Sequence, residues 1–234
     1  MTDPISQGLR WDPDPAFVWA LGCWPSLTGA ERPGTALHVG CGTGRNAVYL
    51  SRQGMSVVGF ERSVRALEKA RLRIESIELD RPPALIEGDL QNGLPTGIFD
   101  LVADIFVYDE LVEPSVRNAY RTALARAVAP GGALLLCVTS RGDERYTERS
   151  PGVDAPGPVA VPDPAIGGIR LLFALEDLER EMSDRFSLRM LWRREKFAPG
   201  SPVSRYLVTL WSPSPPAKTG VRQVGAAPLE DRTG

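Results

Sequence analysis

The chain has 234 residues, of which 43% are hydrophobic and 24% charged, with a formal net charge of −2. These values favour one globular domain with a full core and give no basic surface of the kind that nucleic acid requires. No apolar run approaches the roughly 18 residues of a membrane span, and the first residues lack the apolar stretch of a signal peptide. Three cysteines, Cys23, Cys41 and Cys137, show no metal or disulfide spacing, which is typical of a reducing cytoplasm.

Residues 1–34 are rich in proline, glycine and tryptophan, and we expect them to form an N-terminal cap with a short helix at Ala16–Cys23. Trp11, Trp19 and Trp24 either fold over the mouth of a binding site or pad the edge of the core. Packing is the commoner use of buried aromatic rings.

The segment TALHVGCGTGRNAVYLSRQGMSVVGFERS, Thr35–Ser63, organises the chain as strand, glycine turn, helix and strand. The first strand is apolar and partly β-branched, as in a buried parallel sheet, and the helix has apolar residues at helical spacing. The predicted elements are a strand at Thr35–Val39, a helix at Arg45–Gln53 and a strand at Ser56–Phe60.

Gly40, Gly42 and Gly44 alternate in the turn, where glycine allows the backbone to pass close under a ligand. Glu61 follows the second strand at about the 20-residue distance that places a carboxylate on ribose hydroxyls. A nicotinamide cofactor would require G-x-G-x-x-G, and Arg45 stands where the third glycine would fall. The turn therefore favours a nucleotide-like cofactor other than a dinucleotide.

The runs VGCGTGRNAVYL and VVGFERS resemble the first two motifs of the Rossmann-like (class I) S-adenosylmethionine-dependent methyltransferases. The resemblance is greatest to the small-molecule group that includes thiopurine and tellurite-resistance methyltransferases. It implies that the glycine turn lies against the methionine end of S-adenosyl-L-methionine and that Glu61 binds the ribose hydroxyls. The family usually carries Asp or Glu at the position of His38. The cofactor-binding residues expected in these two motifs are His38, Gly40, Cys41, Gly42, Gly44, Arg45, Glu61 and Arg62.

A helix is predicted at Ser63–Asp80, with Ser63 as its N-cap, and a third strand at Ala84–Glu87. Taken alone, the Gly-Asp-Leu triplet after this strand reads as a turn. In register after the glycine turn it resembles the family position at which the acid binds the adenine amine and the next residue meets the ring. The resemblance therefore implies that Asp89 and Leu90 bind the cofactor.

The fourth strand is predicted at Phe99 to about Phe106, opening with FDLV, a recurrent family motif. Its far end should reach the carboxyl edge of the sheet, where ligands bind in open α/β folds. Methyl transfer relies mainly on alignment, so a base is needed only if the acceptor must lose a proton. The residues expected at this edge are Asp104, Tyr108 and Asp109 as catalytic candidates, with Glu110 beside them, and Asp104 and Ile105 as cofactor contacts.

Alternatives stay open for these residues. Asp109 and Glu110 would otherwise cap a turn and Tyr108 would pack, and Asp104 would otherwise face the methionine amine of the cofactor. His38 is the chain's single histidine and lies in a predicted buried strand, which favours a structural histidine over a hydrolase or metal site, so no metal is expected.

The rest of the chain predicts a helix closed by Pro-Gly-Gly, a buried strand, a long connection, a helix and two antiparallel strands. The connection, residues 140–168, is expected to be a lid or a solvated loop. These segments are a helix at Glu113–Ala129, strands at Ala133–Thr139, Phe186–Phe197 and Val203–Trp211, a helix at Ala174–Met182, and a disordered tail at 212–234.

We therefore predict an α/β, Rossmann-like three-layer sandwich, with a mostly parallel seven-stranded sheet and an antiparallel C-terminal hairpin. Residues 1–211 would form one methyltransferase domain, acting in the cytoplasm on a small molecule as a monomer or homodimer, without nucleic acid or membrane. Two alternatives remain: a cofactor-binding protein of this fold without activity, and an NAD(P)-dependent oxidoreductase.

Overall fold

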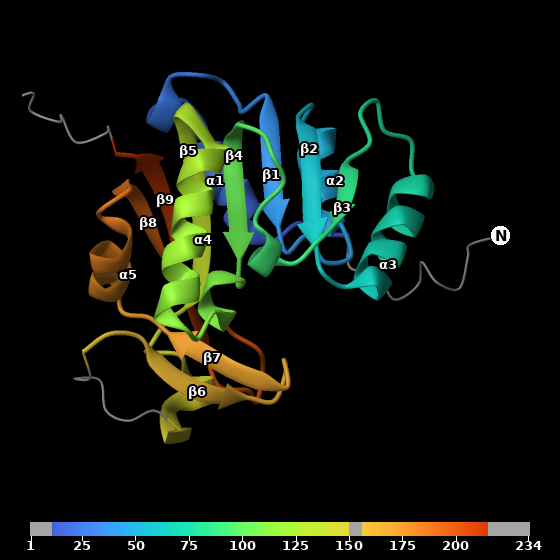
Figure 1. The fold of residues 1–234 in the computed structure, drawn as a ribbon. Helices are drawn as coiled ribbons and strands as arrows, with labels where there is room; N and C mark the ends of the chain where they lie inside the picture. The colour runs from blue at the N-terminus through green and yellow to red at the C-terminus, as the bar shows by residue number, and fades with distance from the viewer. Residues whose placement is uncertain (1–10, 150–155, 215–234) are drawn as a thin grey trace, which may run out of the picture.

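The computed structural model describes residues 11–149 and 156–214, in which a central sheet lies between two layers of helices (Figure 1). The helices are α1 (Pro15–Thr28), α2 (Arg45–Arg52), α3 (Val64–Glu75), α4 (Pro114–Ala127) and α5 (Leu175–Met182). The 3₁₀ turns are η2 (Leu90–Asn92), η3 (Tyr108–Glu110) and η4 (Glu144–Arg149). The strands are β1 (Thr35–Val39), β2 (Ser56–Glu61), β3 (Ala84–Glu87), β4 (Phe99–Ile105), β5 (Val128–Thr139), β6 (Val159–Asp163), β7 (Gly168–Leu172), β8 (Phe186–Lys196) and β9 (Ser204–Pro213).

Seven strands form one sheet in the order β3-β2-β1-β4-β5-β9-β8. β1 to β5 pair in parallel, whereas β9 is antiparallel to both β5 and β8. This topology confirms the predicted fold class. The strand order reverses at β1, and ligands bind at such a switch point, beyond the carboxyl ends of the strands.

Each face of the sheet carries its own apolar core, because successive side chains of a strand point to opposite faces. Leu37 and Val102 pack with α4 and α5 on the face toward the viewer of Figure 1. Ala36 and Leu101 pack with α1 and α2 behind the sheet. Burial on both faces explains why these strands read as continuous apolar runs.

Two predicted helices end at least two residues earlier in the structure. Ser63 caps α3 as expected, but the helix stops at Glu75, where the hydroxyl of Ser76 donates to the Arg73 carbonyl at 2.8 Å. A serine hydroxyl that competes for a helix carbonyl in this way favours the end of a helix.

The helix expected at Glu113–Ala129 ends at Ala127, and β5 begins at once, so that the run 130–132 lies inside the strand. A Cβ on Gly132 would lie 2.5 Å from the carbonyl oxygen of Asp100 in β4. The glycines therefore serve a close backbone approach at a shift of register between β4 and β5, instead of a helix stop.

The connection at residues 140–168 holds an antiparallel hairpin in its second half, formed by β6 and β7 and separate from the main sheet. Figure 1 shows it below the carboxyl end of β4. The hairpin has a small core of its own, made by Tyr146, Val159, Val161 and Leu172. The sequence did not predict this hairpin within the connection, because the short V-A-V-P-D alternation is too brief to indicate a strand.

The last strand continues through Pro213, so the first two residues of the predicted tail belong to β9. Residues 215–234 of that tail lie outside the described part of the chain.

The tryptophans of the N-terminal segment differ in their surroundings. Trp24 is 2% exposed in the core, and Trp19 packs against Trp192 of β8 with ring centroids 6.0 Å apart. Trp11 is 37% exposed and lies against the guanidinium of Arg73. Two of the three rings therefore serve packing.

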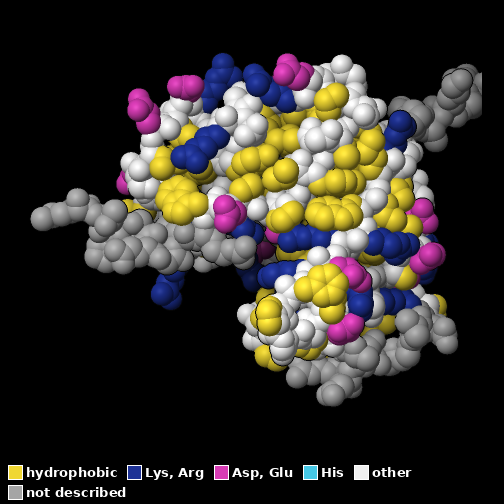
Figure 2. Space-filling view, turned by 180° about the vertical axis from the view of Figure 1, so that it is seen from behind, with side chains coloured by type: hydrophobic (Ala, Val, Ile, Leu, Met, Phe, Trp, Pro, Cys, Tyr) yellow, Lys and Arg dark blue, Asp and Glu magenta, His cyan; other side chains and the backbone are white. Residues whose placement is uncertain are grey.

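Hydrophobic side chains also gather across the back of the molecule (Figure 2), the side on which α1 lies. This helix is apolar on most sides, so Phe17 is buried while its neighbour Val18 is 48% exposed. Among the helices of the described residues, none has the length and apolar character that a membrane crossing requires.

Candidate functional site

The glycine turn joins β1 to α2 at the carboxyl edge of the sheet. Gly40, Gly42 and Gly44 have φ values of 65°, 54° and 79°, which residues with a Cβ rarely adopt. A Cβ on Gly40 would lie 2.4 Å from a methyl carbon of Val107 in the loop after β4. The turn therefore depends on glycine both for its backbone conformation and for its approach to the neighbouring loop.

Glu61, at the end of β2, holds this turn in place. Its Oε2 accepts a hydrogen bond from the Gly42 amide at 3.0 Å, and its Oε1 accepts one from the Ser63 amide at 2.9 Å. A carboxylate has about four acceptor positions, so the half-buried side chain keeps capacity for a ligand.

A pocket with a volume of about 750 Å³ opens at this edge, within the range of small-molecule sites. Six of the residues predicted to bind the cofactor line it: Gly40, Glu61, Arg62, Asp89, Leu90 and Ile105. They come from the ends of β1, β2, β3 and β4, which the parallel topology brings to one edge. Asp89 also caps η2, accepting from the Gln91 amide at 2.9 Å.

The opposite wall of the pocket comes from segments distant in sequence. It is formed by the loop after β4, η3, the start of α4 and the tip of the β6–β7 hairpin. Its residues are Phe106, Val107, Glu110, Leu111, Val112, Val116, Ile166, Gly167, Gly168 and Ile169. Part of the segment predicted to be a lid or a solvated loop thus lines the pocket.

His38 does not line this pocket, although the resemblance implied a cofactor contact. It is 1% exposed, its ring meets that of Phe17 edge-on at 5.0 Å, and its Nδ1 has no hydrogen-bond partner among the described residues. Burial and then the charge of Arg45 lower its pKa to about 3, so the imidazole is neutral. The structural role weighed from the sequence fits this environment.

Arg45 and Cys41 of the turn do not line the pocket either. Nη1 of Arg45 donates to the Asp12 carbonyl at 2.9 Å, and its guanidinium pairs with Asp14 at 3.5 Å, which ties the N-terminal segment to α2. Burial, followed by the charge of Glu61, raises the pKa of the Cys41 thiol to about 12, which keeps the thiol protonated.

Asp104 lies at the end of β4 but is fully buried outside the pocket lining. Oδ1 accepts from the Val107 amide at 2.9 Å and the Tyr108 amide at 3.2 Å, and Oδ2 accepts from the Tyr120 hydroxyl at 2.8 Å. The carboxylate shapes the loop that carries the pocket wall. Burial raises its pKa to about 7, against the effect of these hydrogen bonds.

This pKa predicts a pH-dependent contribution to stability. A carboxyl group whose pKa rises on folding penalises the folded state once it must ionise, so the penalty grows from about pH 4 to about pH 7 and is constant above. The free energy of unfolding of the native protein, relative to Asp104→Asn, should therefore fall over this window. Urea unfolding at several pH values measures it. Asp184→Asn, at an exposed position, is the control and should run parallel to the native protein. Parallel curves for Asp104→Asn would contradict the prediction.

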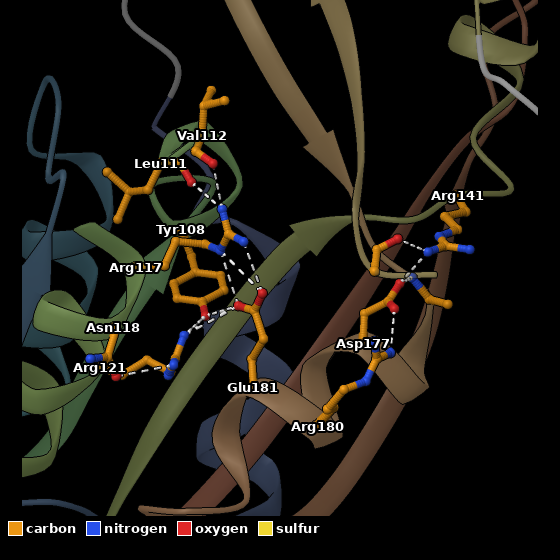
Figure 3. A network of polar contacts seen from close by, with 12 residues as sticks. Tyr108, Leu111, Val112, Arg117, Asn118, Arg121, Arg141, Asp177, Arg180 and Glu181 are labelled. Carbon is orange, nitrogen blue, oxygen red and sulfur yellow. Dashed lines mark hydrogen bonds and ion pairs between the residues drawn. The ribbon is translucent and has the colours of Figure 1, made fainter. Parts of the chain in front are cut away.

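Tyr108 is buried, and its hydroxyl is engaged with α4 and α5, as Figure 3 shows. It donates to the Glu181 carboxylate and accepts from Nη1 of Arg121 at 3.0 Å. Glu181 also pairs with Arg117 at 3.0 Å. Burial and then the charge of Glu181 raise the pKa of this tyrosine, which keeps the phenol protonated.

Asp109 is likewise fully buried and joins three elements. It accepts from the amide and hydroxyl of Thr139 at 2.9 and 2.7 Å, and from Nη1 of Arg170 at 2.7 Å. Because Arg170 belongs to β7, its pair with Asp109 fixes the hairpin against η3, and Arg170 also bonds Asp163 of β6 at 2.6 Å. The three catalytic candidates of the sequence therefore support the pocket wall without lining it.

Glu110 is the acid of this segment that reaches the pocket. Its side chain is 33% exposed, and Oε1 accepts from Nη2 of Arg170 at a loose 3.3 Å. Burial raises its pKa, while the charge of Arg170 opposes the rise. From the sequence, Glu110 is expected at the same edge of the sheet as Tyr108 and Asp109. No local pattern shows that Glu110, and not Asp109, reaches the pocket.

Phe106 marks the place where β4 enters this wall. Its φ of 64° makes it the single non-glycine residue with positive φ among the described residues, a conformation that is strained for a bulky side chain. Its ring contacts Tyr206 at 5.0 Å, and its amide donates to the Cys137 carbonyl at 2.9 Å. Strain of this kind persists where the surroundings fix it and often lies at binding sites.

Residues 37–136 match the sequence model of the family described as "Methyltransferase domain". Thiocyanate methyltransferase 1 of Arabidopsis thaliana is 31% identical over 102 residues, which cover 44% of this chain and 44% of that protein. The chain spans about half the length or less of the first curated relatives that it matches.

Solved structures share the fold over most of the chain. An S-adenosylmethionine-dependent methyltransferase from Clostridium acetobutylicum superposes with a TM-score of 0.64, at 14% identity over 89% of this chain and 94% of that one. The 1,6-didemethyltoxoflavin-N1-methyltransferase of Burkholderia thailandensis, solved with bound S-adenosylhomocysteine, gives 0.62 at 17% identity over 84% and 77%. The sheet order, the glycine turn and these superpositions show that the chain has the Rossmann-like fold of the class I S-adenosylmethionine-dependent methyltransferases, and its central segment matches the methyltransferase-domain model.

Proposed function

We propose that this protein transfers a methyl group from S-adenosyl-L-methionine to a small molecule bound in the 750 Å³ pocket. The observation that carries the proposal is that two different walls surround one pocket. One wall is formed by the strand ends, with the glycine turn and the carboxylate expected to bind ribose. The opposite wall is aliphatic. The residues fit the cofactor, because Gly40 lines the pocket without a side chain and Glu61 keeps acceptor capacity. A relative named for thiocyanate and a structural neighbour named for 1,6-didemethyltoxoflavin support a small acceptor.

The cofactor, when bound, supplies an activated methyl group on a positively charged sulfur. In this proposal Glu61 accepts hydrogen bonds from the ribose hydroxyls, and Asp89 and Leu90 hold the adenine. The hairpin tip, with Ile166 and Ile169, acts as a lid that excludes water from the acceptor. Asp104, Tyr108 and Asp109 position the wall and receive no role in proton transfer.

We further propose one methyltransferase domain, extended from 1–211 to the end of β9 at Pro213. It would act in the cytoplasm as a monomer or homodimer, without nucleic acid or membrane as partners. The three free cysteines and the net charge of −2 support these assignments.

The test is calorimetric titration with S-adenosylhomocysteine beside NADH on the same preparation. Micromolar binding of the first and none of the second supports the proposal, and the reverse would favour the oxidoreductase. Binding of neither would overturn the cofactor assignment. Turnover on a panel of methyl acceptors then distinguishes an enzyme from a binding protein that has lost activity.

Glu61→Ala should weaken S-adenosylhomocysteine binding by about 1–3 kcal/mol, because the ribose hydroxyls lose a charged, half-buried acceptor. The matched control is Glu87→Ala, since Glu87 pairs with Glu61 in register on β3 but does not line the pocket. Calorimetry of both variants checks the prediction, with thermal unfolding to report the loss of the Gly42 and Ser63 hydrogen bonds. Equal affinities in the two variants would remove Glu61 from the cofactor site.

A further inference from the structure

The wall of the pocket opposite the cofactor residues is aliphatic and partly open to solvent. Four of its residues, Val112, Val116, Ile166 and Ile169, are large hydrophobic side chains with 38–39% exposure. They come from two segments far apart in sequence, yet surround one opening. Exposed aliphatic groups gathered in this way indicate a site for an apolar ligand.

Glu110 is the single charged side chain in this aliphatic wall as the described residues form it. Its partner Arg170 is already bonded by two closer carboxylates, Asp163 at 2.6 Å and Asp109 at 2.7 Å, against 3.3 Å for Glu110. Three carboxylates thus share one guanidinium, which leaves the wall with an excess of negative charge. Arg62 adds a positive charge to the pocket, but it follows Glu61 on the cofactor side and is exposed.

We propose that the methyl acceptor is a small apolar amine and that Glu110 receives its nitrogen. The inference rests on the proposed function and adds the class of substrate. The aliphatic wall takes the apolar body, and the carboxylate pairs with the ammonium group. Before the nitrogen can attack, the ammonium gives one proton to Glu110, leaving a neutral amine with a free lone pair and a neutral acid.

The geometry of this wall suits an ammonium group better than it suits an anionic acceptor. An anionic acceptor would lie beside a carboxylate that is only loosely paired, and like charges at short range are unfavourable in a partly dry site. Burial also raises the pKa of Glu110, with Arg170, Asp109 and Arg62 as the charged groups facing it, which brings the acid closer to the range where it takes a proton.

The test uses the full chain saturated with S-adenosylhomocysteine, whose own binding is measured first. Four probes are then titrated by calorimetry: benzylamine, benzyl alcohol, benzoate and thiocyanate. Benzylamine is expected to bind about 10-fold or more tightly than benzyl alcohol, which shares its ring and lacks its charge. Benzoate and thiocyanate should bind more weakly than the alcohol.

Glu110→Gln should remove the preference for benzylamine and leave benzyl alcohol unchanged. Glu113→Gln is the control, because Glu113 is exposed at the start of α4 and does not line the pocket. In the native protein, benzylamine binding should also weaken as the pH falls through the pKa of Glu110, whereas alcohol binding should not. This second measurement needs no variant.

The outcomes separate the two proposals. Failure of S-adenosylhomocysteine to bind would overturn the proposed function and this inference with it. Binding of S-adenosylhomocysteine together with a preference for benzoate or thiocyanate would overturn the amine alone. An amine preference that survives in Glu110→Gln and is independent of pH would also overturn it.

Discussion

Arg170→Met is expected to lower the free energy of unfolding by about 3–5 kcal/mol, the usual cost of leaving buried charges without their partner. The arginine side chain is 9% exposed, and those of Asp109 and Asp163 are 0% and 5% exposed. Methionine preserves the apolar stem but leaves both carboxylates without a cation. Urea unfolding at pH 7, followed by tryptophan fluorescence, measures the change.

Arg180→Met is the matched control for this prediction. Arg180 also pairs with a buried carboxylate, that of Asp177 at 2.7 Å, but its own side chain is 57% exposed. Solvent screening limits such pairs to about 1 kcal/mol or less. If Arg170→Met cost no more than this control, the ionic attachment of the hairpin would be of minor importance.

Gly40→Ala should be the most damaging small substitution in the glycine turn, with a cost of about 2–4 kcal/mol. The residue has a φ of 65°, and an added Cβ would stand 2.4 Å from a Val107 methyl carbon. Relief would push the loop after β4 into the pocket, so S-adenosylhomocysteine affinity should fall with stability. Urea unfolding and calorimetry on one preparation report both effects.

Substitutions at two other glycines separate the cost of the backbone conformation from the cost of the contact with Val107. Gly42 has a φ of 54° with no atom within 4 Å of an added Cβ, so Gly42→Ala should cost about 1–2 kcal/mol for conformation alone. Gly22 lies inside α1 with free space around it, and Gly22→Ala should stabilise the protein by about 0.5–1 kcal/mol. Equal effects at Gly40 and Gly42 would show that the contact with Val107 yields readily.

Much of the fold was predictable because its signals are local. Thr35–Val39 and Ala84–Glu87 form strands with the predicted boundaries, and Ser63 caps α3 as expected. The glycine turn and Glu61 meet because their spacing within one strand–helix–strand unit already determines where each lies. Such features depend on neighbours in sequence, which a pattern can reveal.

The acceptor side was not predictable in the same way. Which acid of the run after β4 reaches the pocket depends on the reversed φ of Phe106 and on Arg170, about 60 residues further along the chain. Asp104 and Asp109 turn inward because Tyr120, Thr139 and Arg170 offer them donors. No spacing in the sequence indicates that these residues become partners.

The place of β9 in the sheet also bears on how the chain is synthesised. Because β9 lies between β5 and β8, the outer edge of β5 stays unpaired until the end of β9 leaves the ribosome. The roughly 75 residues that separate the two strand ends take about 4–15 s to translate. During that time the run Leu134–Val138 presents a bare apolar strand edge, the kind that pairs with other chains. In a nascent chain of this topology, that edge is therefore open to pairing with other chains until β9 is in place.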